Sequence, residues 1–242
     1  MTISVAISGA SGRMGTLIQQ IIADTDGLEL HSALTSSSAK EEMLGADVLI
    51  DVTRIDVSEA NVDFALEHGI NVVVGTSGWG QERLAALESG IPEGQGVIIV
   101  PNFSVGSVLG THLATIAGKF YDSIEILEAH HDKKVDSPSG TAVRTAEAIS
   151  AARDSEPVPP NADQPSRGQV VAGIPVHALR LRGVVADQQV IFGGTGETLT
   201  IRHETFSNTA YTHGIQLALN AAATATGLTV GIDGLLGIGE AK

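Results

Sequence analysis

The chain has 242 residues and a formal net charge of −14, because 28 acidic residues outnumber 14 lysines and arginines. Such an excess of negative charge argues against binding to nucleic acids or anionic membranes, and 3% aromatic residues leave little for base stacking. The absence of cysteine excludes disulfides, thiolate nucleophiles and cysteine-ligated metals. No apolar run reaches transmembrane length and no signal-like segment precedes the first expected strand, so we expect a cytoplasmic protein.

Residues 1–103 alternate short runs rich in Val and Ile with amphipathic stretches. The expected strands are Ile3–Ser8, Leu28–Leu34, Ala46–Val52, Asn71–Val74 and Gly96–Val100, and the expected helices are Met14–Ala23, Ser58–His68 and Gln81–Leu87. Strands that alternate with helices form βαβ units around a parallel sheet covered on both faces. We therefore predict an α/β fold with a Rossmann-type dinucleotide-binding domain over residues 1–103.

The pattern changes after residue 103, where we expect a mixed α+β domain over residues 104–211 with an open mixed sheet. Its expected elements are the strands Ser123–Ala129, Val176–Arg182, Val184–Phe192 and Glu197–Glu204 and the helix Thr141–Arg153. Turns at 182–183 and 193–196 would join the later strands. Residues 154–173, with four prolines, should form a long loop that acts as a lid or interface arm or is disordered. A helix over Thr212–Ala225 and a glycine-rich tail would return to the first domain, completing it with residues 212–242.

A glycine-rich turn, GASGRMG at residues 9–15, follows the first expected strand and opens the first helix. Gly9 would permit a tight turn, Gly12 a close approach of the backbone to a ligand, and Gly15 close packing of the helix on the strand. The N-terminus of a helix in this position favours a pyrophosphate group. We therefore expect NADPH or NADH to bind here, in contact with Gly9, Ala10, Ser11, Gly12, Arg13 and Met14.

The end of the second strand bears on the choice of coenzyme. An acidic residue there usually holds the ribose hydroxyls of NADH, whereas this chain has Thr35 and Ser36. Hydroxyls, with Arg13 in reach, would not repel a 2′-phosphate, so we expect NADPH to be accepted at least as well as NADH; the alternative is a merely polar loop. Further coenzyme contacts are expected after the fourth and fifth strands, from Gly75, Thr76, Ser77, Val100, Pro101, Asn102 and Phe103.

The segment from Glu128 to Thr141 combines proton-transfer groups with a candidate anion site. Two histidines and two lysines fall within residues 130–134, and Pro-Ser-Gly-Thr follows just before an expected helix. Ser139 is a natural N-cap, so the amides of Gly140 and Thr141 should be free to bind a carboxylate or phosphate. Asp136 should anchor the loop. The segment predicts a site for a small acidic substrate.

Five stretches together resemble the dihydrodipicolinate reductase family. They are GASGRMG at 9–15, VVGTSG at 73–78, PNFSVG at 101–106, EAHHDKKVDSPSGTA at 128–142 and GETLTIRHET at 196–205. The resemblance implies a Rossmann domain, a substrate domain and a homotetramer built through the mixed sheets. It also implies reduction, in the diaminopimelate route to lysine, of the dihydrodipicolinate skeleton formed from 4-hydroxy-tetrahydrodipicolinate to tetrahydrodipicolinate.

The same resemblance implies roles for individual residues toward this small dicarboxylate. His130 matches the proton donor/acceptor of the family and Lys134 its second acid. His131, Gly140 and Thr141 match the groups that hold the substrate, and we expect Ser139 to bind the substrate with them. Thr35 departs from the family, because many members have an acidic residue at this position, and the choice of coenzyme therefore stays open.

Three alternatives can be weighed against this reading. Four histidines (His130, His131, His177 and His203) could converge on a metal, but no HExxH spacing is present and nearby lysines repel a cation, so we expect no metal. A dehydrogenase of the Tyr-xxx-Lys type needs a lysine four residues after a tyrosine, and this chain has none after either of its two tyrosines. A non-catalytic NAD(P)-binding sensor or scaffold would need no proton-transfer cluster.

Overall fold

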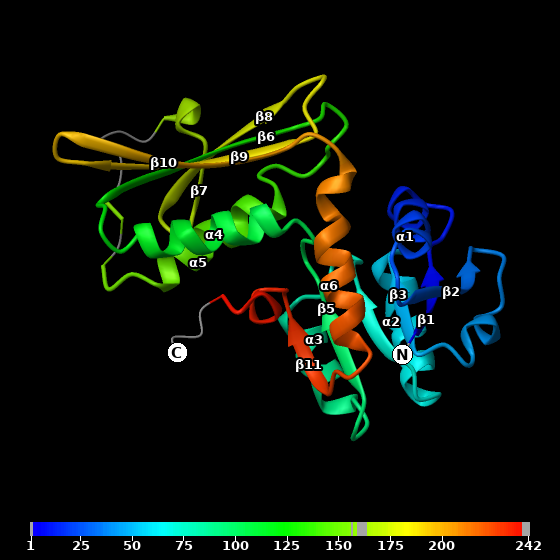
Figure 1. Cartoon of the computed structure of the whole chain (residues 1–242). Coiled ribbons are helices and arrows are strands. Elements are labelled where there is room, and N and C mark those ends of the chain that lie inside the picture. Colours follow the sequence, from blue (N-terminus) through cyan, green and yellow to red (C-terminus); the bar gives the residue numbers. More distant parts are fainter. Residues whose placement is uncertain (1, 156, 159–163, 239–242) are drawn as a thin grey trace. The chain divides into compact units, whose positions relative to one another are not determined.

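The computed structural model describes residues 2–155, 157–158 and 164–238, which divide into two compact units (Figure 1). Unit 1 contains the described residues up to Val105 and from Thr209 onward, and unit 2 runs from Gly106 to Asn208. The first and the last described residues therefore both belong to unit 1. No helix in the described ranges is long and apolar enough to span a membrane.

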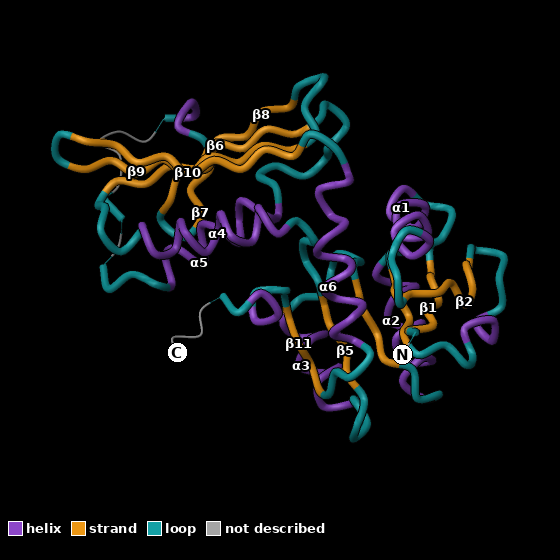
Figure 2. The backbone as a smooth tube through the Cα atoms, viewed as in Figure 1, coloured by secondary structure: helices purple, strands orange, loops and turns teal. Residues whose placement is uncertain are grey.

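Unit 1 is built on a parallel six-stranded sheet in the order β11-β5-β4-β3-β1-β2 (Figure 2). The strands are β1 (Ile3–Ser8), β2 (Leu28–Leu34), β3 (Val48–Asp51), β4 (Asn71–Val74), β5 (Gly96–Ile99) and β11 (Gly227–Val230). The helices of this unit are α1 (Arg13–Ala23), α2 (Ile55–Glu67), α3 (Gln81–Gly90) and α6 (Thr212–Ala222). The expected Rossmann-like fold is confirmed, and the strand order reverses between β1 and β3, the point at which such sheets bind ligands.

The central strands of unit 1 are buried along their whole length, as a sheet covered on both faces requires. The helices are amphipathic instead: α1 buries one stripe formed by Gly15, Ile18, Ile21 and Ile22. Apolar side chains from β3, β4, β5 and α2 meet in one core cluster beneath the sheet. This core holds the carboxyl ends of the strands at one edge, where the candidate coenzyme loops begin.

Unit 2 is a mixed sheet with helices on one face. The sheet has the order β10-β9-β6-β8-β7, and Figure 1 shows both helices on the same side of it. Its elements are β6 (Ser123–His130), β7 (Gln169–Val171), β8 (Ile174–Arg180), β9 (Ala186–Gly194), β10 (Glu197–Thr205), α4 (Val105–Ala117) and α5 (Gly140–Ala151). Ile126, Ile149 and Phe192 pack in the core between the two layers. The expected open mixed sheet is confirmed.

Several elements differ from the sequence expectation. The turn at 182–183 does not make neighbours of β8 and β9, because β6 lies between them, parallel to β8 and antiparallel to β9. No helix was expected at α4, where Gly106 and Gly110 weaken the helical pattern. Gly106 allows α4 to pack closely on β10, since a Cβ there would lie 2.7 Å from the ring of His203.

Two strands occur where none was expected. Strand β7 lies within the predicted 154–173 loop and reaches β8 through a tight turn in which Ala172 and Gly173 both have positive φ. Residues 156 and 159–163 of that loop lie outside the described residues. Strand β11 forms in the glycine-rich tail because it can pair with the edge of β5, a contact between segments far apart in sequence.

Candidate active site

The glycine turn after β1 is shaped by backbone contacts that allow no side chain. Gly9 has a φ of 88°, and a Cβ there would lie 2.6 Å from the carbonyl oxygen of Val52. A Cβ on Gly15 would lie 2.2 Å from the carbonyl oxygen of Gly9, so only glycine lets α1 pack this closely on the turn. The tight turn predicted at Gly9 is confirmed, and Gly15 permits close packing of the helix, on the turn that follows the strand.

The N-terminus of α1 is open to a ligand. No side chain caps it, and no acidic residue occupies its first turn. Ser11, Gly12 and Arg13 are exposed, whereas Ala10 is buried and Met14 half-buried. Free amides, an adjacent cation and the helix dipole suit a pyrophosphate, so this turn fits the dinucleotide expected from the sequence.

The loop after β2 lies directly beside this turn. The amides of Gly9 and Ala10 both donate to the carbonyl oxygen of Leu34, at 3.1 and 3.0 Å, which places Thr35 next to the glycine turn. The Thr35 hydroxyl lies 3.0 Å from that of Ser37, and Thr35 and Ser36 are exposed. The loop therefore presents hydroxyls, without a carboxylate, at the edge of the candidate coenzyme site.

A buried aspartate organises the loops after β3 and β4, and sequence reasoning gave it no definite role. Asp51 is fully buried and accepts hydrogen bonds from Asn61 at 2.8 Å, from the Thr76 hydroxyl at 2.5 Å and from the Thr53 hydroxyl at 2.9 Å. The Thr76 hydroxyl therefore donates its hydrogen bond to Asp51 and not to a ligand. What the 75–77 loop can offer a coenzyme is its backbone and the exposed Ser77.

The loop after β5 packs against the loop after β4. A Cβ on Gly75 would lie 2.7 Å from the ring of Phe103, which is itself buried, so these two residues fix the separation of the loops. Asn102 accepts the amide of Ser104 at 2.9 Å, and Pro101 is exposed. Phe103 thus acts as a core residue, while the strand end at Val100 is held by a 2.7 Å hydrogen bond to Val74.

In unit 2, the last residue of β6 is a histidine held by a buried carboxylate. His130 Nδ1 lies 2.6 Å from Oε2 of Glu128, which is fully buried, and the His130 side chain is 16% exposed. Arg180 of β8 donates to both oxygens of Glu128, each at 2.9 Å. Burial acts to raise the pKa of Glu128, but hydrogen bonds from His130, Arg180 and the Ser139 amide outweigh it and lower this pKa below its usual value.

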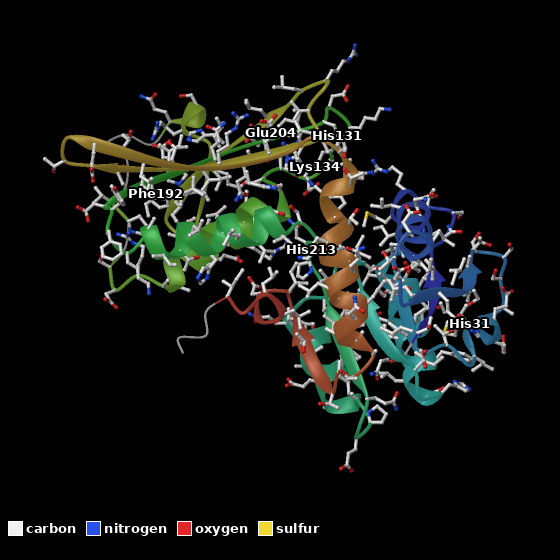
Figure 3. The ribbon with its side chains drawn as sticks, viewed as in Figure 1. His31, His131, Lys134, Phe192, Glu204 and His213 are labelled. Carbon is white, nitrogen blue, oxygen red and sulfur yellow. The ribbon has the colours of Figure 1, made fainter. Side chains whose placement is uncertain are left out.

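The loop after β6 carries the lysine of the site. Lys134 Nζ lies 2.8 Å from Oδ1 of Asp136, and the amide of Lys134 donates to the carbonyl of His131 at 3.1 Å. The hydrogen bond from Lys134 is the main reason that the pKa of Asp136 is lowered. Figure 3 shows His131 and Lys134 at one end of the mixed sheet, whereas Phe192 lies between sheet and helices. Asp136 anchors this loop, as expected.

The start of α5 agrees with the sequence in one respect and differs in another. Ser139 Oγ accepts the amide of Ala142 at 3.2 Å, so Ser139 is the predicted N-cap. The Ser139 amide, however, donates to Glu128 at 3.1 Å. The expectation that the Gly140 amide is free stays a prediction; the Asp136 carboxylate, whose pKa this amide helps to lower, lies near it. Thr141 is half-exposed at the helix start.

Gly140 offers a direct test of this helix start as an anion site. The residue is exposed, and a Cβ would meet nothing closer than Arg144, at 3.8 Å. Gly140→Ala should therefore fold normally and raise the KM for an acidic substrate by roughly 3- to 10-fold, since the added methyl crowds the approach to the helix N-terminus. Steady-state kinetics with a thermal unfolding curve would check this; an unchanged KM would place the substrate elsewhere.

The sequence-predicted residues of unit 2 come together at one end of the mixed sheet. His130, Arg180 and Ser139 all bind the Glu128 carboxylate, and Lys134 pairs with Asp136 just before the start of α5. The roles of Glu128 and Arg180 were missed, although a carboxylate two residues before a histidine on a strand shares its face. Among the described residues, no three His, Asp or Glu side chains are grouped to hold a metal.

A glycine turn and loops at the carboxyl edge of a doubly wound parallel sheet are typical of nicotinamide-dependent oxidoreductases. Comparisons with known proteins identify the family. Residues 3–103 match the family "Dihydrodipicolinate reductase, N-terminus" and residues 106–236 match "Dihydrodipicolinate reductase, C-terminus". The chain belongs to the dihydrodipicolinate reductase family.

Individual relatives agree with this membership. A 4-hydroxy-tetrahydrodipicolinate reductase of Clavibacter sepedonicus is 56% identical over 98% of this chain and 87% of its own length. The enzyme of the same name from Cutibacterium acnes is 43% identical over 98% of this chain and 99% of its own. A solved dipicolinate-bound dihydrodipicolinate reductase from Paenisporosarcina sp. TG-14 is 29% identical, with a TM-score of 0.84 over 97% of this chain and 99% of that one.

Proposed function

We propose that this chain reduces the dihydrodipicolinate skeleton, formed from 4-hydroxy-tetrahydrodipicolinate, to tetrahydrodipicolinate in the diaminopimelate route of lysine biosynthesis. The observation that carries the proposal is the His130–Glu128 pair, placed at one sheet end with Lys134 and the start of α5. The two relatives above bear the name of this activity. A non-catalytic coenzyme sensor would have no use for such a cluster.

The proposed substrate is a ring with two carboxylates. Cationic Lys134 and the N-terminus of α5 suit one of these carboxylates, and His131 and Thr141 lie on the same two segments. The Paenisporosarcina reductase was solved with dipicolinate, a ring of this kind. Because the Ser139 amide donates to Glu128, we assign Ser139 to shaping the helix start rather than to direct binding.

The proposed chemistry divides between coenzyme and protein. When bound, the dihydronicotinamide supplies the hydride. The chain's own residues then have to deliver a proton to the electron-rich nitrogen system of the ring. His130 can do this from Nε2, because Nδ1 is engaged by Glu128, and Lys134 can act as a second acid while it holds the substrate.

The proposed coenzyme is NADPH or NADH, held by residues 9–14, 35–36, 75–77 and 100–103. The hydroxyl-bearing loop at Thr35 supports acceptance of NADPH at least as readily as NADH. We further propose a cytoplasmic homotetramer assembled through the mixed sheets. The sheet face opposite the helices supports this, because Leu179 and Val170 are 42% and 59% exposed. Sedimentation or light scattering would measure the subunit number.

Thr35→Asp tests the assignment of coenzyme choice. A carboxylate beside the glycine turn would repel a 2′-phosphate and accept hydrogen bonds from ribose hydroxyls. We expect the KM for NADPH to rise about 10- to 100-fold, with the KM for NADH unchanged or lower. Thr195→Asp, which adds the same charge in the exposed turn between β9 and β10 of unit 2, serves as the control. Equal effects on both coenzymes would show that this loop does not contact the 2′-position.

The activity itself can be tested with substrate made in situ from pyruvate and aspartate semialdehyde by a dihydrodipicolinate synthase. Loss of reduced-nicotinamide absorbance is followed with NADPH and NADH in parallel. Oxidation that requires both the synthase and this protein is the expected result. If both coenzymes bind and neither is consumed, the proposed reaction is refuted while the coenzyme site stands.

A further inference from the structure

The carboxylate of Glu128 receives four hydrogen bonds. Its Oε2 accepts from His130 Nδ1 at 2.6 Å and from Arg180 Nη1 at 2.9 Å. Its Oε1 accepts from Arg180 Nη2 at 2.9 Å and from the amide of Ser139 at 3.1 Å. The donors come from three segments: the end of β6, the end of β8 and the start of α5. One buried group therefore links the proton-transfer residue to the helix start proposed to bind the substrate.

This arrangement determines which nitrogen of His130 can react. An ionised carboxylate can only accept hydrogen bonds, so His130 Nδ1 must carry a hydrogen whether the ring is neutral or charged. The neutral ring then has its lone pair at Nε2, and the charged ring has its transferable proton there. Arg180 compensates the buried charge and cannot itself accept a hydrogen bond.

Hydrogen bonds also fix the backbone around His130. Its carbonyl accepts the amide of Leu181 at 2.8 Å, and Arg180 donates to the carbonyls of Leu179 and Asp136, each at 2.6 Å. The end of β8 thus holds both the histidine and the loop that carries Lys134. His130 is thus held by hydrogen bonds at its backbone carbonyl and at ring atom Nδ1. The ring nitrogen Nε2 is the one left to react.

We propose that Glu128 is a positioning residue of the reaction: it holds His130 in the Nδ1–H tautomer, with Nε2 toward the reacting ring, and joins this group to the start of α5. The inference rests on the proton-transfer role proposed for His130. A carboxylate that orients a histidine in this way contributes to the reaction rate as well as to packing, because the other tautomer places its proton on the wrong nitrogen.

The first test reads the tautomer in the wild-type protein and uses a variant only to assign the signals. The protein is labelled with ¹⁵N-histidine, and two-bond ¹⁵N–¹H correlations are recorded at a pH high enough for neutral imidazole, with His130→Gln to assign the signals. We expect a pyrrole-like Nδ1 and a pyridine-like Nε2 for His130. The opposite pattern, or fast averaging between the two tautomers, would overturn the inference.

The second test separates positioning from structure. Glu128→Gln keeps the shape but places an amide NH₂ among four donors, so we expect kcat to fall about 10- to 100-fold and the His130 tautomer to change. Glu125→Gln is the matched control: it lies on the same strand and accepts hydrogen bonds from His177 and Arg167, none of which belongs to the proposed site. This control should keep the wild-type kcat.

Since Glu128→Gln leaves half-buried Arg180 without its counter-charge, a double variant with Arg180→Met removes both charges and protects the fold. A folded double variant with low kcat and an altered tautomer supports positioning. Wild-type kcat in either folded variant, or low kcat with the native tautomer, overturns it. If His130→Gln itself turns over normally, the proposed role of His130 fails instead, which distinguishes the two failures.

Discussion

Replacing His130 with glutamine is expected to lower kcat by about 10²- to 10⁴-fold, the range that a positioned acid contributes. Glutamine occupies a similar volume and can still donate a hydrogen bond to Glu128, so the fold and the neighbouring Arg180 pair should persist. What is lost is the imidazole, the group proposed to deliver the proton. The KM for the substrate should change by less than about fivefold, because the residues proposed to hold the carboxylates are untouched.

Coenzyme binding gives the internal control for this variant. The dissociation constant of NADPH, followed by fluorescence quenching or calorimetry, should stay within about twofold of wild type, since the glycine turn belongs to unit 1 and His130 to unit 2. His68→Gln, at an exposed position after α2, should leave kcat unchanged. A kcat for His130→Gln within a few fold of wild type would remove His130 from the proposed mechanism.

The sequence predicted those parts of the fold that have strong local signals. β1, β2 and β4 begin and end at the expected residues, and α1 begins one residue early, because buried apolar runs and a glycine turn bound them on each side. Helix α4 was missed because its glycines at 106 and 110 reflect packing on His203, a contact 93 or more residues away. Strand β11 was missed because four residues carry no periodicity until β5 offers an edge.

The site shows the same division between local and distant information. The chemistry-bearing segment at 128–141 and its Ser139 cap could be read directly, since a cap and the helix it begins are adjacent in sequence. The partnership of Glu128 with Arg180 could not, because 52 residues separate them and only the pairing of β6 with β8 brings them together. The structural role of Asp51 was missed for a similar reason, because its partners Asn61 and Thr76 come from other elements.

Lys134→Ala should impair both turnover and substrate binding, with kcat lower by about 10²-fold and the substrate KM higher by about 10-fold. The Lys134 side chain is only 22% exposed, and its ammonium group is proposed to serve as second acid and as carboxylate ligand. Lys133→Ala is the matched control, since this neighbour is exposed and its loss changes the net charge by the same amount. Wild-type kinetics for Lys134→Ala, or an equal loss for Lys133→Ala, would contradict the assignment.

The partner of Lys134 allows the two effects to be separated. Without the lysine, Asp136 keeps its negative charge beside the Gly140 amide and loses the hydrogen bond that chiefly lowers its pKa. That charge should repel a substrate carboxylate at the start of α5. Adding Asp136→Asn to Lys134→Ala should therefore lower the KM again by about 3-fold or more without restoring kcat, because neutralising the aspartate removes repulsion but supplies no acid. A double variant that regained kcat would show that Lys134 acts only by masking Asp136, and proton delivery would then fall to His130 alone.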